Sequence, residues 1–186
     1  LERRGHCFVR YADDCNVYVR SRTSGARVLA ALRTLYGRLK LKINEAKSAV
    51  AQATQRKFLG FSFYRHQGQI KRRVAPKALD TFKVRIRQIT RRSGGKSLEQ
   101  VVEHLRAYLP GWKHYFQLAE TPSTFRALDE WLRHRLRVLH LKHWKRGRTA
   151  FKALTALGAS VDDATRVAQN LRCWWVNGYR RLNRAL

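Results

Sequence analysis

Two adjacent aspartates, Asp13 and Asp14, are the residues of this sequence best suited to hold a metal ion. They stand between apolar runs in a chain that has 12 acidic residues against 40 basic ones. Carboxylate oxygens are preferred ligands of Mg²⁺, and a pair of divalent metals can activate a hydroxyl and neutralise a leaving group in phosphoryl transfer. The alternative is a simple polar turn, which is the stronger interpretation of the dipeptide taken alone.

The residues around the aspartates favour the metal site. Residues 7–12 and 16–20 are short β-prone runs, so we expect a β-hairpin that carries Asp13 and Asp14 in its turn. Such a hairpin is a rigid support for metal ligands. Acidic residues are scarce in the rest of the chain, so two adjacent aspartates are less easily explained as a chance feature of a polar turn.

The remaining elements of the first 75 residues mix helix and strand. Ser24-Gly25 is expected to open a helix, because apolar residues then recur along one face at positions 28, 32, 35 and 39. Residues 58–64 and 69–74 are expected to form a second hairpin around Gln67-Gly68. These patterns predict that the first 75 residues form a mixed α/β region.

The remainder, from Pro76, is expected to be almost entirely helical. Apolar residues at helical spacing follow Pro76, and Ser97 with Gln100 matches a capping box for the next helix, which we expect to end at Pro110-Gly111. Further helices are expected from Thr121-Pro122, over residues 149–157, and after Ser160. The fold class predicted is α+β, with a boundary near Ala75-Pro76.

The net charge of +28 points to a polyanionic partner. Nucleic acid is favoured over an anionic membrane surface, because no lipidation motif is visible and no apolar run approaches the roughly 20 residues of a membrane span. Cys7, Cys15 and Cys173 form no paired motif, so reduced thiols and a cytoplasmic location are expected. The chain does not begin with Met, and we expect it to be a piece of a longer protein.

Several motifs then occur in a meaningful order. Tyr11-Ala12-Asp13-Asp14 resembles the YxDD active-site hairpin of reverse transcriptases, and residues 39–48 and the FLGF run at 58–61 resemble the blocks that follow it. The GWKHYF run at 111–116, the helix over 125–137 and the tail over 174–186 resemble the maturase (thumb or X) region of group II intron proteins. Over nearly its whole length the chain is similar to the C-terminal portion of a group II intron-encoded reverse transcriptase/maturase.

The resemblance implies roles for particular residues. Asp13 and Asp14 would bind Mg²⁺ in a two-metal site, and Lys47 would act near the pyrophosphate leaving group, with a solvated surface lysine as an equal alternative. Five residues would lie near the primer and the nucleotide: Tyr11 and Ala12, and the primer-grip residues Phe58, Leu59 and Gly60. These enzymes also need a third carboxylate from an earlier palm strand, which the given residues do not contain. We therefore expect the chain alone not to polymerise DNA.

Basic residues interleaved with aromatics in the helical part suit RNA. Trp112 and Trp131 are expected to pack in the core, and His140 and His143 to be surface residues rather than metal ligands. The residues expected to bind RNA are Lys83, Arg85, Arg87, Arg91, Arg92, Lys113, Arg133, Arg137, Trp144, Lys145 and Arg146.

The resemblance implies that residues 1–75 end a reverse-transcriptase palm and that residues 76–186 form a thumb/maturase domain. The parent would be an RNA-directed DNA polymerase and a maturase that aids group II intron splicing and mobility in the bacterial cytosol or nucleoid. Its partners would be structured intron RNA, an RNA template with a DNA primer, and deoxynucleotide triphosphates. The alternatives are a truncated RNA-binding maturase module without polymerase activity, or a related reverse transcriptase of host defence or CRISPR systems.

Overall fold

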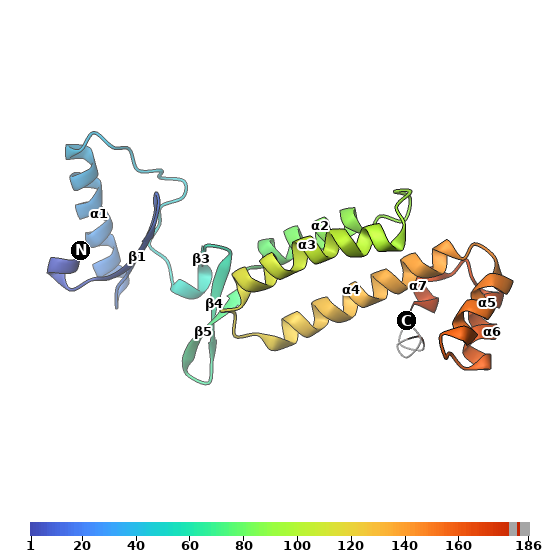
Figure 1. The fold of residues 1–186 in the computed structure, drawn as a ribbon. Helices are drawn as coiled ribbons and strands as arrows, with labels where there is room; N and C mark the ends of the chain where they lie inside the picture. Colours follow the sequence, from blue (N-terminus) through green and yellow to red (C-terminus); the bar gives the residue numbers. More distant parts are fainter. Residues whose placement is uncertain (179–181, 183–186) are drawn as a thin grey trace. The chain divides into compact units, whose positions relative to one another are not determined.

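The structure, a computed structural model, describes residues 1–178 and residue 182 (Figure 1). The chain divides into two compact units, Leu1–Lys71 and the residues from Arg72 onward. The first unit is mixed α/β and the second is largely helical, so the α+β class predicted from the sequence is confirmed. No helix of the described residues is long and apolar enough to cross a membrane.

The first unit begins with a short 3₁₀ helix, η1 (Glu2–Arg4), followed by an antiparallel hairpin of β1 (Cys7–Tyr11) and β2 (Asp14–Tyr18). Helix α1 (Arg22–Arg38) starts two residues earlier than expected, because Ser21 is its N-cap and accepts a hydrogen bond from the Ser24 backbone N–H. Gly25 allows α1 to pack closely, since a Cβ there would lie 2.6 Å from Val50 Cγ1.

A three-stranded antiparallel sheet follows the 3₁₀ helix η2 (Ala53–Gln55). Its strand order is β3 (Lys57–Phe58), β4 (Phe61–His66), β5 (Gln69–Val74). The single strand expected over 58–64 is wrong: Leu59 and Gly60, at φ of 49° and 76°, make a two-residue turn that pairs Phe58 with Phe61. The second turn, Gln67-Gly68, lies where the sequence predicted it. Both turns have positive φ at two successive residues, as type I′ hairpins require.

The described residues of the second unit form six helices. They are α2 (Pro76–Ile89), α3 (Leu98–Phe116), α4 (Pro122–His143), α5 (Gly147–Ala156), α6 (Val161–Gln169) and α7 (Trp174–Asn177). Both hydrogen bonds of the Ser97–Gln100 capping box are present. Ser160 caps α6 by accepting from the Asp163 backbone N–H.

Helix α3 runs through Pro110, so the expected end at Pro110-Gly111 is wrong. A proline inside a helix removes one backbone hydrogen bond and crowds the preceding turn. Here the cost is offset because residues on both sides of the proline are anchored. Leu109 and Trp112 pack against the core, and Phe116 is buried.

Two hydrophobic clusters form the core of the second unit. The first joins α2, α3 and α4 and includes Phe82, Ile86, Leu105 and Leu132. The second joins α5 and α6 to the end of α4 and includes Leu141, Leu154 and Val167. Every buried hydrophobic residue of the described chain lies at Val74 or beyond it.

Candidate nucleic-acid interface

The β1–β2 hairpin brings the two aspartates to a tight turn. Tyr11 pairs with Asp14 in the strand register, and only Ala12 and Asp13 form the turn. The expectation that both aspartates lie in the turn is half right, because Asp14 is the first residue of β2. Ala12 has a φ of 52°, and its carbonyl accepts a hydrogen bond from Arg10 Nε at 3.0 Å. The neighbouring Arg10 side chain therefore stabilises the turn.

Asp13, Asp14 and Tyr11 are all exposed, and Tyr11 is 63% exposed. Two exposed carboxylates on one turn suit Mg²⁺, which is commonly held by one or two carboxylates together with water and substrate phosphates. Among the residues that the structure describes, no cluster of three His, Cys, Asp or Glu side chains could hold a metal ion. The hairpin therefore presents a carboxylate pair rather than a complete protein cage.

Phe58 ends β3, Leu59 and Gly60 form the turn between β3 and β4, and all three are half-buried. Lys47 lies in the loop after α1 and is exposed. Its backbone is held at both ends: the N–H bonds Asn44 Oδ1 at 3.2 Å, and the carbonyl accepts from Arg56 Nη2 at 2.6 Å. No hydrogen bond or ion pair among the described residues joins the Lys47 side chain to either aspartate.

Most of the basic residues selected in the second unit lie at its surface. Arg85 donates to Gln88 on the same helix, and Arg91 donates to Ser93 just after it. Arg133 pairs with Asp129 across one turn of α4, so part of its charge is compensated. Lys83 is half-buried, and the exposed members of the set are Arg85, Arg87, Arg91, Arg92, Lys113, Arg133, Lys145 and Arg146.

Arg137, which the sequence predicted to bind RNA, does not lie at the surface. Its side chain is buried, and Nε donates to the carbonyl of Gly178 at 2.7 Å. The guanidinium therefore joins α4 to the residue after α7 instead of facing solvent. Burial, followed by the nearby charge of Arg133, lowers the pKa of Arg137 from its ordinary value.

The aromatic residues also depart in part from expectation. Trp112 and Trp131 pack against the first cluster, as expected. Trp144, selected as an RNA contact, is half-buried against the second cluster and meets His140 edge-on, with ring centroids 4.7 Å apart. Trp144 therefore packs within the second unit, and its contact with RNA stays a prediction. The part of the C-terminal motif at 179–181 and 183–186 lies outside the described residues.

Sequence reasoning missed Arg135 and Lys142, which the structure places beside Arg87 and Arg92. Arg135 lies over the Trp131 ring at 5.4 Å from its centroid, and Lys142 donates to the Arg92 carbonyl at 2.7 Å. The Trp131–Arg135 pair is detectable in the sequence as an i, i+4 spacing on one helix. The link to Arg92 joins residues 50 positions apart, so no local pattern indicates it.

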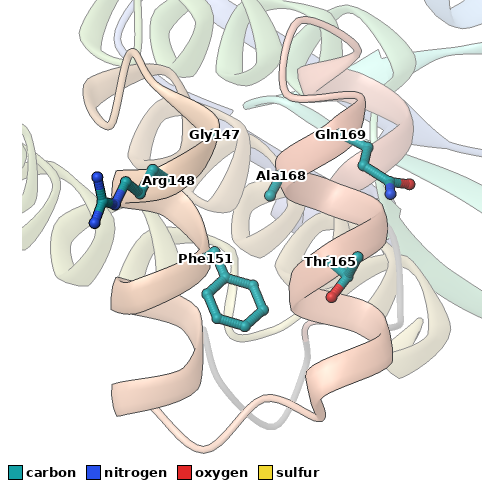
Figure 2. A pocket seen from close by; sticks show the side chains of 6 residues that line it. All are labelled: Gly147, Arg148, Phe151, Thr165, Ala168 and Gln169. Atoms are coloured by element: carbon teal, nitrogen blue, oxygen red, sulfur yellow. The ribbon is translucent and has the colours of Figure 1, made fainter.

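A groove of about 390 Å³ lies between α5 and α6 and is lined by Gly147, Arg148, Phe151, Thr165, Ala168 and Gln169. Figure 2 shows Phe151 of α5 and Ala168 and Thr165 of α6 along its walls. Arg148 is the only ionisable side chain of this lining. The groove therefore has no pair of groups suited to acid–base or nucleophilic chemistry.

Comparison with protein families finds one matching family model in each of the two units. Residues 1–63 match the family model described as reverse transcriptase (RNA-dependent DNA polymerase). Residues 79–158 match the one described as group II intron, maturase-specific domain. No curated protein matches the chain.

The hairpin with its paired aspartates and the basic helical unit thus belong to a reverse transcriptase region followed by a maturase region. The order of the two regions is the one that the sequence motifs predicted. These two matches, in this order, are those expected of a fragment of a group II intron reverse transcriptase/maturase that contains parts of both domains.

Proposed function

We propose that the chain carries the metal-binding hairpin of an RNA-directed DNA polymerase together with the RNA-binding surface of a group II intron maturase. The observation that carries the proposal is the Tyr11–Asp14 pair, which closes a two-residue turn and exposes both aspartates. In this assignment residues 1–75 end the palm and residues 76–186 form the thumb/maturase domain. The polymerase and maturase would act in the bacterial cytosol or nucleoid.

In the polymerase, Asp13 and Asp14 would bind Mg²⁺, which lowers the barrier to attack by the primer hydroxyl and neutralises the pyrophosphate. The left-handed Ala12 turn positions the carboxylates, and Tyr11 lies beside them on β1. The turn of Phe58, Leu59 and Gly60 would hold the primer strand, since a glycine permits close approach of a backbone. Lys47 would stabilise charge on the leaving group.

As a maturase, the second unit would bind structured intron RNA through its exposed arginines and lysines. Support comes from the net charge of +28 and from the position of these residues on the surface of α2, α3 and α4. This activity needs no metal-bound active site. A chain that binds RNA without polymerising DNA is therefore the second candidate, and it is favoured by the absence of a third carboxylate near the pair among the described residues.

A template–primer extension assay with Mg²⁺ and deoxynucleotide triphosphates tests whether these residues contain a complete polymerase site. We expect this chain to bind the template–primer and to add no nucleotides by itself. Sustained incorporation that is lost in Asp13→Asn would instead show a complete polymerase site within these residues. An absence of RNA binding at low salt would contradict both candidates.

Metal binding by the hairpin has its own test. Mn²⁺ titration followed by paramagnetic relaxation should show binding that Asp13→Asn and Asp14→Asn each weaken. The matched control is Asp80→Asn, which removes an exposed carboxylate from α2. An equal loss in the control would mean that the hairpin pair has no special affinity for the ion.

A further inference from the structure

Four cations of the second unit are gathered on two tryptophan rings. The guanidinium carbons of Arg87 and Arg135 lie 5.6 Å and 5.4 Å from the centroid of Trp131. The guanidinium carbon of Arg92 and the ammonium of Lys142 lie 5.8 Å and 5.7 Å from the centroid of Trp174. We call the set of Arg87, Arg92, Arg135 and Lys142 the basic seam, because it follows the line where α2 and its C-terminal loop meet α4 and α7.

Hydrogen bonds fix the seam in place. Arg135 Nε donates to the Thr90 hydroxyl at 2.8 Å, and the buried Thr90 hydroxyl donates to the Ile86 carbonyl at 2.6 Å. Lys142 donates to the Arg92 carbonyl at 2.7 Å. These bonds tie α4 to α2 and its loop, so Arg135 and Lys142 are held before any ligand arrives and lose less side-chain entropy on binding.

The positive charge of the seam has no ion-pair partner in the part of the chain that the structure describes. No carboxylate of the described residues forms an ion pair with any of the four cations. Residues 179–186, outside the description for the most part, include no Asp or Glu in the sequence. Burial first, and then the charges of Arg87 and Arg92, lower the pKa of Arg135 from its ordinary value. An anion placed between these groups would relieve their mutual repulsion.

The tryptophan rings indicate which part of a nucleic acid the seam can bind. Trp131 packs against the first cluster and Trp174 against the second, and both are half-buried. Each ring also carries two cations, which leaves little ring surface on which a base could stack. The rings therefore position charge, and the guanidinium groups suit bidentate bonds to phosphate oxygens.

We propose that the basic seam is a phosphate-binding site for the sugar–phosphate backbone of folded, double-stranded RNA. In folded RNA the bases are paired and the backbone is the accessible surface, which matches a site that offers charge and no free aromatic face. The proposal rests on RNA binding by the second unit as stated above, and it assigns that binding to four particular residues. It adds Arg135 and Lys142 to the contacts and removes base recognition from this surface.

The test uses the full chain and two labelled RNA hairpins with stems of different sequence. The seam variant Arg87→Gln/Arg92→Gln removes two exposed charges, and the control Arg106→Gln/Lys152→Gln removes two exposed charges from α3 and α5. Affinity is measured by fluorescence anisotropy over a series of salt concentrations. Thermal unfolding of each variant checks that its fold is retained.

The seam variant should lose about 10-fold or more in affinity at low salt, equally for both hairpins. The slope of log K against log salt should fall in magnitude by about 1 for each phosphate contact removed, as expected for backbone neutralisation. The control should lose less than about 3-fold. Arg135→Lys, which keeps the charge and removes the planar fork, should weaken binding by an intermediate amount.

Three outcomes would overturn the proposal. Equal losses in seam and control variants would mean that general charge alone binds RNA. A loss confined to one stem sequence would mean that bases are read. Displacement of the RNA by anionic phospholipid vesicles, at lower phosphate concentration than the competing unlabelled hairpin, would assign the seam to a membrane surface. If the unchanged chain bound neither hairpin, the proposed function itself would fail, which separates that result from the other three.

Discussion

Arg137 donates its Nε–H to the Gly178 carbonyl at 2.7 Å, and this hydrogen bond joins the buried face of α4 to the residue that follows α7. The same carbonyl lies 2.9 Å from Nδ1 of the buried His134. One carbonyl thus connects two residues of α4 to the residue that follows α7. The guanidinium of Arg137 is therefore engaged inside the second unit, whereas the sequence predicted that it binds RNA.

Arg137→Gln should destabilise the second unit. The substitution removes a charge-assisted hydrogen bond in a buried place, and such losses cost about 1–3 kcal/mol of unfolding free energy. Urea unfolding measures the change. Arg133→Gln is the matched control, since Arg133 is 68% exposed and bonds only a surface carboxylate, and it should have little effect. A variant of Arg137 with unchanged stability and reduced RNA affinity would restore the role inferred from the sequence.

His134 should make stability depend on pH. Burial lowers the pKa of His134 below its ordinary value, the bond to the Gly178 carbonyl opposes this, and the charges of Arg137 and Arg135 add to the lowering. The folded state therefore binds fewer protons than the unfolded state, so stability is full above about pH 6.5 and falls as the solution becomes more acidic. Unfolding free energies measured between pH 8 and pH 5 give the slope.

The slope should become smaller in His134→Asn, because the replacement can still donate to the Gly178 carbonyl and does not titrate. Some acid dependence should remain, since burial and then the charge of His143 also lower the pKa of His140, with Glu99 opposing. His114→Asn, which changes an exposed histidine of α3, is the matched control. The same slope in all three proteins would exclude His134 as the source.

Gly147→Ala and Gly111→Ala should have opposite effects on stability. A Cβ at Gly147 would lie 2.5 Å from the backbone oxygen of Ala168, so α5 and α6 would have to separate. Overpacking of this kind typically costs about 1–3 kcal/mol. A Cβ at Gly111 would meet nothing within 4 Å, and alanine inside a helix is better than glycine by about 0.5–1 kcal/mol. Thermal unfolding checks the signs, and two changes of the same sign would contradict the packing described.

Pro110→Ala should stabilise α3. The exposed proline lies inside the helix, and alanine restores the missing N–H together with the better helix propensity, by up to about 3 kcal/mol. Amide hydrogen exchange of residues in the middle of α3 should slow in the variant. Faster exchange would mean that the proline bend is needed to pack Leu109 and Trp112 against the first cluster.

Local signals in the sequence predicted much of the second unit. The Ser97 capping box, the Pro76 and Pro122 starts and the Ser160 cap all concern residues within three positions of one another, and each is present in the structure. The Pro110 error arose because local propensity opposes a helix there, while packing of Trp112 and Phe116 favours it. Tertiary contacts override propensity at such positions.

At the candidate sites too, local sequence signals were predictive and tertiary contacts were not foreseen. The Tyr11–Asp14 turn was found because its chemistry is contained in four consecutive residues. Arg137 was selected and Arg135 was missed because α4 is basic on more than one face. Only the contacts with Gly178 and Thr90 show which arginine is buried and which is aligned with α2. No spacing within one helix separates these cases.

The distribution of buried residues has a consequence for how the chain unfolds. All buried hydrophobic residues lie at Val74 or beyond, while Leu35, Leu39 and Leu41 of the first unit are about half or more exposed, at 49%, 66% and 58%. With so little apolar area removed from water, the first unit contributes little to the cooperative transition, and its local opening free energy should be low. A protease should therefore cut before Val74 first and leave a helical product that still melts as one unit, so a single melting temperature describes α2 to α6 and not the hairpin with the aspartates.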